Sequence, residues 1–154
     1  FRINGLAAYD RLGCSVSSAG DFNGDGYDDL LIGGEGSGSG GETYLIFGKS
    51  TTYASSLNVA TLNGTDGFRL DGIDTSDLAG CSVSSAGDVN GDGFDDLLIG
   101  AESADPNGEN LAGESYVVFG HSSGFSSPFD LSTLNGANGF RINGEGPQAF
   151  SAIP

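Results

Sequence analysis

Two short segments concentrate acidic side chains at a spacing suited to binding a hard cation. The first runs from Asp21 to Asp29 and the second from Asp88 to Asp96, and each places four carboxylates within nine residues. Side chains at positions 1, 3 and 5 of such a loop can converge on one point, and the glycine at position 6 permits a sharp turn. Oxygen ligands of this kind suit Ca²⁺, and a flexible, carboxylate-rich loop suits it better than the smaller Mg²⁺. The segments therefore predict two calcium sites.

The predicted ligands follow from the positions within each loop. Side chains supply positions 1, 3, 5 and 9, and the backbone carbonyl at position 7 adds a further oxygen. Asp at position 9 substitutes for the Glu that an EF-hand carries at position 12, where Ile32 and Ile99 stand here. Asp28 and Asp95, at position 8, are left out because they can point outward. The candidate metal ligands are Asp21, Asn23, Asp25, Tyr27 and Asp29 in the first loop and Asp88, Asn90, Asp92, Phe94 and Asp96 in the second.

The same residue types also occur in turns that bind no metal. Asn-Gly and Asp-Gly favour tight hairpins, so a single loop of this kind could be a turn and nothing more. Two near-identical loops favour calcium binding, because in each of them the clustered carboxylates repel one another unless a cation lies among them.

The loops belong to a longer internal repeat. The segment GCSVSSAGDFNGDGYDDLLIG begins at Gly13 and returns at Gly80 with two substitutions, 67 residues further along the chain. The second copy then carries five extra residues, which fall within residues 103–113. We divide the chain into a first unit at residues 1–67, a second unit at 68–139 and the start of a third, truncated unit at 140–154.

The elements that must position these loops are short strands. The apolar runs are bounded by glycine, and none shows helical spacing, so we expect an all-β fold. The first set of four strands is expected at residues 14–19, 29–32, 43–47 and 68–70. The segments 49–66 and 121–138 are expected to be loops with a short turn of helix near residues 57–62 and 131–134.

Four-stranded units that repeat at this period are typical of β-propeller blades, but two blades cannot close a ring. Three arrangements stay open. The chain is part of a larger propeller, or several chains assemble the ring, or the two blades form an open body whose edge strands can pair with another chain.

Several residues outside the loops have simpler expected roles. Cys14 and Cys81 take equivalent places in the two units and are expected to be small buried side chains. His121, the only histidine, is expected to be a solvated loop residue. The dipeptide Phe-Arg recurs at residues 1–2, 68–69 and 140–141. We expect its ring to pack between sheets and its arginine to pair with a nearby acid.

The repeat resembles the FG-GAP repeat of integrin alpha-subunit propellers and related bacterial surface proteins. The calcium motif of that family, DxDxDGxxD with Asn allowed at the third position, maps onto the two acidic loops from Asp21 and from Asp88. The resemblance implies two four-stranded FG-GAP blades of a β-propeller. It also implies calcium loops between the first two strands of each blade, a structural role for Ca²⁺, and ligand recognition by other loops.

The net charge and the calcium loops indicate which partners and which compartment to expect. Twenty-one acidic residues against five basic ones give a formal net charge of −16, which argues against binding to nucleic acid or to an anionic membrane surface. No stretch approaches the ~18 apolar residues needed for membrane insertion. Loops of this kind in extracellular modules bind Ca²⁺ with dissociation constants of about 10⁻⁴–10⁻³ M, so an extracellular or cell-surface setting is expected.

The sequence favours a binding role over catalysis. One histidine and no Cys/His metal spacing leave an enzyme without support. We expect a calcium-binding, integrin-alpha-like propeller segment that acts in cell adhesion or protein–protein interaction. A lectin-like carbohydrate-binding module and an accessory domain of an extracellular hydrolase are the alternatives. The partner would be a protein or a glycan, and the missing blades would come from a homo-oligomer or from a longer chain.

Overall fold

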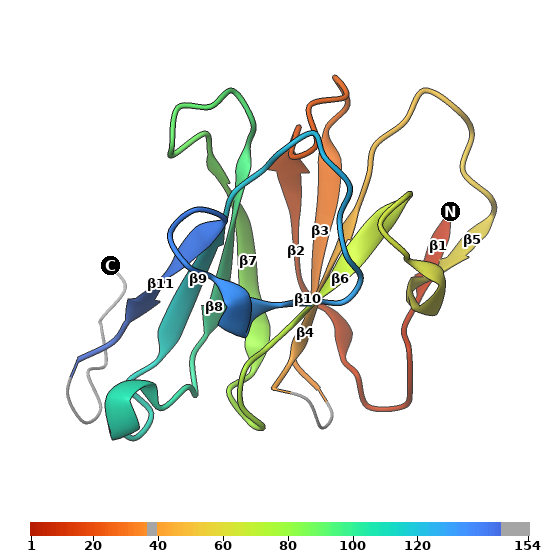
Figure 1. Cartoon of the computed structure of the whole chain (residues 1–154). Coiled ribbons are helices and arrows are strands. Elements are labelled where there is room, and N and C mark those ends of the chain that lie inside the picture. Colours follow the sequence, from red (N-terminus) through yellow and green to blue (C-terminus); the bar gives the residue numbers. More distant parts are fainter. Residues whose placement is uncertain (37–39, 146–154) are drawn as a thin grey trace.

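The chain folds into β-strands joined by loops (Figure 1). The computed structural model describes residues 1–36 and 40–145, and these ranges contain three single-turn 3₁₀ helices and no α-helix. The all-β prediction is confirmed. No helix in the described ranges is long and apolar enough to cross a bilayer.

The first sheet is an antiparallel set of four strands with a fifth added at its outer edge. In the order of hydrogen bonding, the strands are β2 (Leu12–Gly20), β3 (Asp29–Gly34), β4 (Glu42–Ile46), β6 (Gly67–Asp71) and β10 (Phe129–Asp130). The fifth strand, β10, comes from the second half of the chain and runs parallel to β6. The first set of four predicted strands therefore forms, and a strand that was not predicted extends their sheet.

The second sheet repeats the first without the added strand. Its order is β7 (Ala79–Gly87), β8 (Asp96–Ala101), β9 (Glu114–Val118) and β11 (Gly139–Asn143), and all neighbours are antiparallel. A separate pair joins β1 (Arg2–Asn4) and β5 (Ser56–Asn58) in parallel. These sheets are consistent with two propeller blades.

The two large sheets lie side by side, with the first strands β2 and β7 adjacent at the centre (Figure 1). Their facing sides enclose the main core. Its buried members are Ala19, Phe22, Leu31, Leu45, Phe47, Phe68, Leu70, Ala79, Leu97, Ile99, Ala101, Ala104, Tyr116, Val118 and Leu131. A smaller core on the other side of the first sheet contains Ile32, Tyr44, Ile46, Val59 and Leu62. Because alternate residues of a strand face opposite sides, β3 supplies both cores.

The segments predicted as loops contain the expected turns of helix. Val59–Thr61 and Leu131–Thr133 are single 3₁₀ turns, and each begins after a residue whose side chain accepts a backbone N–H, Asn58 and Asp130 respectively. This is N-capping, which satisfies an otherwise unpaired donor at the first turn. The third turn, Pro106–Gly108, lies in the insertion at 103–113.

The hydrogen-bonded sheets cross the unit boundaries drawn at residues 67 and 139. The strand β6 completes the first sheet and β11 completes the second, so each sheet takes its fourth strand from residues placed in the next unit. The units themselves stay a prediction. Of the third unit, residues 146–154 lie outside the described residues.

Two expectations about single residues are wrong. Cys14 is exposed and Cys81 is half-buried, and both are free thiols; each lies in the register shift near the start of its strand, which interrupts the regular alternation of side chains. Of the Phe-Arg pairs, only the middle one behaves as expected, since Phe68 is buried and Arg69 pairs with Asp71 and Glu42. Phe1 and Phe140 are exposed.

Candidate metal-binding loops

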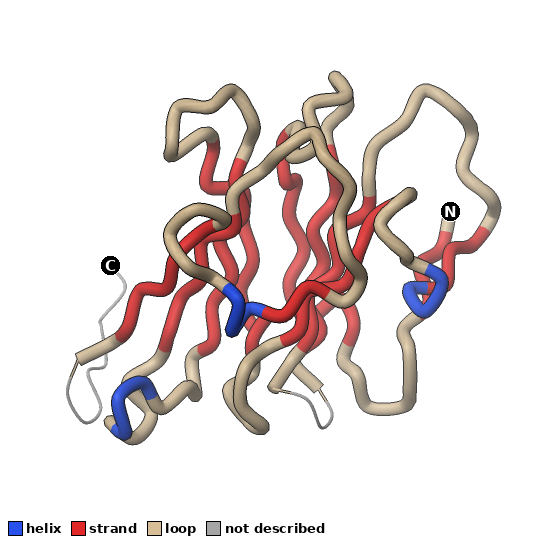
Figure 2. Tube along the Cα trace, viewed as in Figure 1, coloured by secondary structure: helices blue, strands red, loops and turns tan. Residues whose placement is uncertain are grey.

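The two acidic loops connect equivalent strands at the same end of the molecule. The first joins β2 to β3 and the second joins β7 to β8, and both lie at the top of the view in Figure 2. Each loop is entered through a register shift, after which Gly20 pairs with Asp29 and Gly87 with Asp96. The loops therefore sit between the first two strands of each sheet, as predicted.

Within the first loop, three side chains turn inward and accept backbone N–H groups. The Asp21 carboxylate accepts from the amides of Asp25 and Gly26, both at 2.9 Å. Asn23 Oδ1 accepts from the amide of Asp25 at 2.9 Å, and Asp25 Oδ1 accepts from that of Tyr27 at 3.0 Å. Positions 1, 3 and 5 are thus on the inner side of one tight loop.

The second loop repeats this network residue for residue. Asp88 accepts from the amides of Asp92 and Gly93 at 3.1 and 2.9 Å. Asn90 Oδ1 accepts from the amide of Asp92 at 2.9 Å, and Asp92 Oδ1 accepts from that of Phe94 at 3.0 Å. Two sequences that differ at positions 2 and 7 therefore adopt the same local structure.

The aspartate at position 9 is buried in both copies, and its hydrogen bonds link the loop to its sheet. Asp29 is 3% exposed and accepts from the amides of Phe22 and Gly48, at 3.2 and 2.8 Å. Asp96 is fully buried and accepts from the amides of Val89 and Gly120, both at 2.9 Å. Phe-Gly pairs at residues 47–48 and 119–120 mark this contact, because their glycine amides are these donors and follow the third strand of each sheet.

Burial and neighbouring charge make the ionised form of Asp29 costly. The pKa of Asp29 is raised to about 6, chiefly by burial and also by the nearby charges of Asp25 and Asp21, against the opposing effect of the hydrogen bonds from Gly48 and Phe22. A buried carboxylate beside two other carboxylates is an environment in which a divalent cation is strongly favoured over bare ionisation.

The donor set fits a hard cation, since every candidate ligand atom is an oxygen. Positions 3 and 5 approach each other closely, with Asn23 Nδ2 donating to Asp25 Oδ2 at 3.0 Å and Asn90 Nδ2 to Asp92 Oδ2 at 2.8 Å. In the described ranges, however, no three His, Cys, Asp or Glu side chains are grouped closely enough to hold a metal ion. The structure therefore shows the predicted loops, and the ten metal ligands stay predictions.

The two loops also contact each other through a residue that was left off the ligand set. Asp95 Oδ2 accepts from the backbone amide of Asp21 at 2.8 Å, so a side chain of the second loop bonds to the first residue of the first loop. The ring of Phe94 lies against Gly24, where an added Cβ would be 2.4 Å from the ring. The sequence shows an Asp at position 8 of both loops. The partner of Asp95 lies in the other repeat, however, so only the tertiary structure reveals this contact between the loops.

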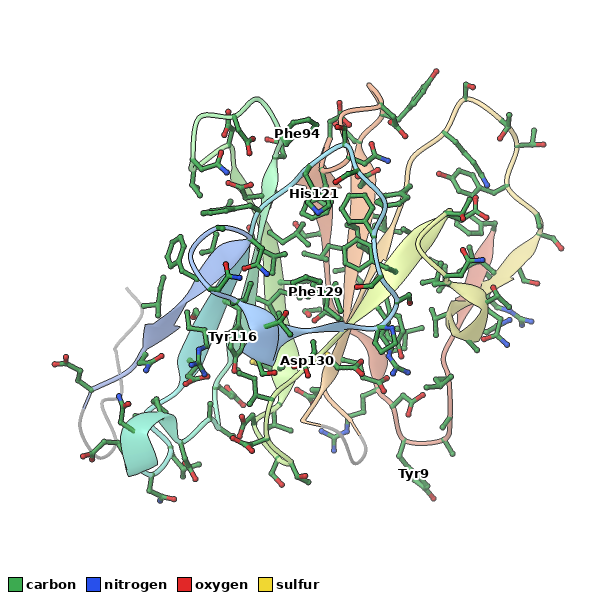
Figure 3. All side chains as sticks on the ribbon, viewed as in Figure 1. Tyr9, Phe94, Tyr116, His121, Phe129 and Asp130 are labelled. Carbon is green, nitrogen blue, oxygen red and sulfur yellow. The ribbon has the colours of Figure 1, made fainter. Side chains whose placement is uncertain are left out.

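The segment after β9 packs against the first loop. The amide of His121 donates to the carbonyl of Phe22 at 3.1 Å, and its ring stacks on Phe125 with centroids 4.3 Å apart. Phe125 in turn stacks on Phe68 at 5.0 Å. His121 therefore belongs to an aromatic cluster under the loops (Figure 3). It is a loop residue, as expected, but it is half-buried rather than fully solvated.

Comparison with known families identifies the repeated unit. A family described as FG-GAP repeat matches residues 15–46 and 82–118, which hold the first three strands of each sheet and both acidic loops. The chain carries two FG-GAP repeats. The predicted relationship is confirmed, and the matched segments coincide with the parts whose local structure repeats.

The relatives of these FG-GAP repeats are long proteins of different kinds. Integrin alpha-PS2 of Drosophila melanogaster is 31% identical over 129 residues, which cover 78% of this chain and 8% of the integrin. Bovine (Bos taurus) phosphatidylinositol-glycan-specific phospholipase D is 36% identical over 121 residues, covering 75% of this chain and 14% of that protein. Integrin alpha-PS5 of Drosophila melanogaster is 32% identical over 106 residues, covering 65% and 10%. The chain thus spans 8–14% of the length of these curated relatives.

Proposed function

We propose that this chain is a calcium-stabilised pair of FG-GAP blades that acts in adhesion or protein–protein interaction on a cell surface or in a secreted protein. The observation that carries the proposal is the repeated loop, in which two copies of the same inward-facing oxygen set end on a buried aspartate. FG-GAP repeats often bind Ca²⁺.

Calcium has a structural role in this proposal. The side chains of Asp21, Asn23, Asp25 and Asp29 and the carbonyl of Tyr27 hold one ion, and their counterparts in the second loop hold the other. Bound Ca²⁺ supplies the positive charge that offsets the repulsion among these carboxylates. Because Asp29 and Asp96 also bond to the amides of Gly48 and Gly120, an ion at the loop stabilises the junction of three strands.

The proposed setting follows from the calcium requirement. With dissociation constants of about 10⁻⁴–10⁻³ M, such sites fill outside the cell and stay empty at cytosolic calcium levels. The net charge of −16 is itself reduced by bound cations, which lowers self-repulsion of the folded chain. Recognition of a protein partner then falls to loops other than the two acidic ones.

A second candidate function is supported by one of the relatives. The similarity to a phospholipase D favours a role as the accessory domain of a hydrolase, whose catalytic residues lie elsewhere. In that role the blades bind the substrate of the hydrolase or orient its catalytic domain, and the 154-residue chain has no hydrolytic activity. A lectin-like role is the third alternative, and binding of the chain to a glycan array would favour it over protein adhesion.

Calcium-dependent stability tests the proposal. Thermal unfolding should shift upward by several degrees in millimolar Ca²⁺ relative to excess chelator, and Mg²⁺ should give a much smaller shift, because binding to the folded state alone stabilises it. An identical melting curve in all three conditions would contradict the structural metal sites.

Calorimetry assigns the ligands to their loops. The wild-type chain should bind two Ca²⁺ ions, and Asp92→Ala should bind one, because the variant lacks the position-5 carboxylate of the second loop. Glu109→Ala is the matched control, since Glu109 is an exposed carboxylate in the insertion at 103–113. Two remaining sites in Asp92→Ala would show that the ligand assignment is wrong.

A further inference from the structure

Three contacts join the two acidic loops to each other, and the first is a reciprocal pair of hydrogen bonds. The amide of Asp21 donates to Asp95 Oδ2 at 2.8 Å, and the amide of Asp95 donates to the carbonyl of Asp21 at 3.4 Å. Asp21 is position 1 of the first loop, and Asp95 lies between positions 7 and 9 of the second. The pair therefore connects the first candidate ligand of one loop to the last two candidate ligands of the other.

The second contact places an aromatic ring of the second loop on the backbone of the first. Phe94, whose carbonyl is position 7 of the second loop, lies with its ring against Gly24, and a Cβ added to Gly24 would be 2.4 Å from that ring. In Figure 3, Phe94 lies between the two loops. A movement of the second loop at position 7 therefore changes a contact with the first loop.

The third contact uses two consecutive amides of the segment after β9. The amide of Gly120 donates to Asp96 Oδ1 in the second loop at 2.9 Å, and the amide of His121 donates to the carbonyl of Phe22 in the first loop at 3.1 Å. A Cβ added to Gly120 would lie 2.4 Å from the carbonyl oxygen of Asp95 and 2.6 Å from that of Phe22. This segment is therefore in contact with both loops at once.

These contacts make the order of one loop depend on the order of the other. Without a cation, the four carboxylates of each loop repel one another and loosen its conformation. A cation that orders the second loop also fixes Asp95 and Phe94, and through them Asp21 and Gly24 of the first loop. Less conformational entropy is then lost when the first loop binds its own cation, which is positive coupling between two sites.

We propose that the two loops bind Ca²⁺ with positive cooperativity and that Asp95 is the positioning residue that couples them. The inference rests on the calcium sites of the proposed function and adds that an ion in either loop raises the affinity of the other. By thermodynamic linkage the factor is the same in both directions, and couplings of this kind typically change affinity by about 5–150-fold.

Electrostatics acts in the opposite direction. Each loop holds four carboxylates, so an ion in one loop removes part of the negative charge that attracts an ion to the other. Salt screens such effects between exposed charges, with a Debye length of about 8 Å at physiological ionic strength, and weakens direct hydrogen bonds much less. We therefore expect the coupling factor to rise with salt concentration. A factor that falls as salt is added would contradict coupling through hydrogen bonds and packing.

Calorimetric titration of the 154-residue chain with Ca²⁺ at physiological salt tests the coupling. Asp92→Ala gives the affinity of the first loop alone, and Asp25→Ala gives that of the second. We expect the wild-type chain to bind its two ions more tightly than these separate affinities predict, by about fivefold or more. Two ions bound with the separate affinities would overturn the coupling and leave the proposed function intact, whereas the absence of any bound ion would overturn both.

Asp95→Ala tests the residue that couples the loops. This variant keeps every candidate ligand, so we expect it to bind two ions with a coupling factor close to that of independent loops. Asp28→Ala is the matched control, because Asp28 holds the same position in the first loop and is exposed. Circular dichroism checks that both variants are folded. Cooperativity that is lost in both variants, or retained in both, would contradict the role of Asp95.

Two glycines provide a matched pair that tests the same contact without altering an acidic residue. Gly20 and Gly87 precede the two loops, and both have a φ of 67°, so alanine is strained to a similar degree at either position. A Cβ at Gly20 would lie 2.1 Å from Asp95 Oδ2, whereas within the described residues no atom lies within 4 Å of a Cβ at Gly87. Gly20→Ala should therefore displace the Asp95 carboxylate and reduce the cooperativity, and Gly87→Ala should retain it. Equal cooperativity in the two variants would show that Asp95 does not couple the loops.

Thermal unfolding gives a readout that does not depend on fitting a binding curve. Ca²⁺ stabilises the folded chain in proportion to how tightly both ions bind, so the loss of coupling reduces the rise in melting temperature between excess chelator and millimolar Ca²⁺. We expect a smaller rise for Asp95→Ala than for the wild-type chain, and an unchanged rise for Asp28→Ala. The same rise in all three proteins would overturn the coupling through Asp95, and no rise in the wild-type chain would overturn the calcium sites themselves.

Discussion

Position 8 of the acidic loops gives one residue type two different environments. Asp28 and Asp95 hold the same position in the two loops, yet Asp28 is exposed and Asp95 is half-buried. The difference arises because the second loop packs against the first, where the Asp95 carboxylate accepts a hydrogen bond from the amide of Asp21. The free energy contributed by such a carboxylate depends on its hydrogen-bond partner and on its burial.

We predict that Asp95→Ala destabilises the chain and that Asp28→Ala does not. The first substitution leaves the amide of Asp21 without its charged acceptor, at a cost of about 1 kcal/mol in the free energy of unfolding. The second changes an exposed side chain and should stay within about 0.5 kcal/mol. Urea denaturation of both variants in excess chelator measures the difference, and equal effects would mean that the contact between the loops contributes nothing.

At the scale of elements, each sheet has the same alternation of side chains but a different number of covered faces. Leu31 on β3 and Leu98 on β8 are repeat counterparts, and only Leu31 lies beneath another sheet. Burial on both faces fits the continuous apolar runs at residues 30–32 of β3 and 44–46 of β4, whereas β2 and β7 consist mainly of small residues and are partly exposed.

Leu31→Ala should therefore cost more than Leu98→Ala. Removal of a fully buried leucine side chain typically costs about 2–5 kcal/mol, because lost burial and a residual cavity add together. Leu98 is 36% exposed, and we expect its truncation to cost roughly half as much or less. Chemical denaturation compares the two variants directly.

The third strands, β4 and β9, carry a second matched pair of features. The hydroxyl of Tyr44 donates to Glu42, and that of Tyr116 donates to Glu114 at 2.6 Å. Burial, with help from the hydrogen bond and charge of the neighbouring glutamate, holds the pKa of both tyrosines far above their ordinary value. The neutral phenols are thus favoured in the folded state.

The sign of the resulting pH dependence follows from the raised pKa. Stability from the two tyrosines is fully present below about pH 10, the pKa of an unfolded tyrosine, and is lost as the pH rises beyond it. We expect the free energy of unfolding to fall steeply above that pH. The double variant Tyr44→Phe, Tyr116→Phe should show a shallower fall, and denaturation at several alkaline pH values measures both slopes. Parallel slopes would contradict the role of these hydroxyls.

At the scale of the whole molecule, the two sheets approach closely at their first strands. Ser15 Oγ on β2 donates to the carbonyl of Gly80 on β7 at 2.7 Å. A Cβ added to Gly33 on β3 would lie 2.0 Å from that same carbonyl oxygen. The backbone of one sheet therefore meets the other here, and only glycine leaves the space that this contact needs.

Gly33→Ala should push the sheets apart, whereas its repeat counterpart Gly100→Ala should not. At Gly100 the nearest atom to an added Cβ is the Ser82 hydroxyl at 2.3 Å, which belongs to a side chain that can rotate away. We expect Gly33→Ala to cost about 1–3 kcal/mol, the usual range for overpacking, and Gly100→Ala to cost less. Thermal unfolding compares the variants, and equal melting temperatures would contradict the close approach.

The repeat period, the all-β class, the four antiparallel strands of the first sheet and the two acidic loops could all be predicted from the sequence. Each depends on local features, such as glycine and Asx turns, apolar alternation and residues recurring at a fixed offset, which are visible without knowledge of packing. The internal hydrogen bonds of the loops also lie within nine residues, so the spacing of Asp21, Asn23 and Asp25 was sufficient to predict their common inward orientation.

The contacts between the repeats could not be predicted in this way, because identical residues acquire different partners according to which sheet lies beside them. The sequence by itself determined that Asp28 and Asp95, or Phe68 and Phe140, occupy equivalent positions in equivalent blades. Only the tertiary structure decided that Asp95 bonds to the other loop and that Phe140 is exposed. The physical reason is that burial depends on the neighbouring sheet, and the two sheets cover only one face of each other.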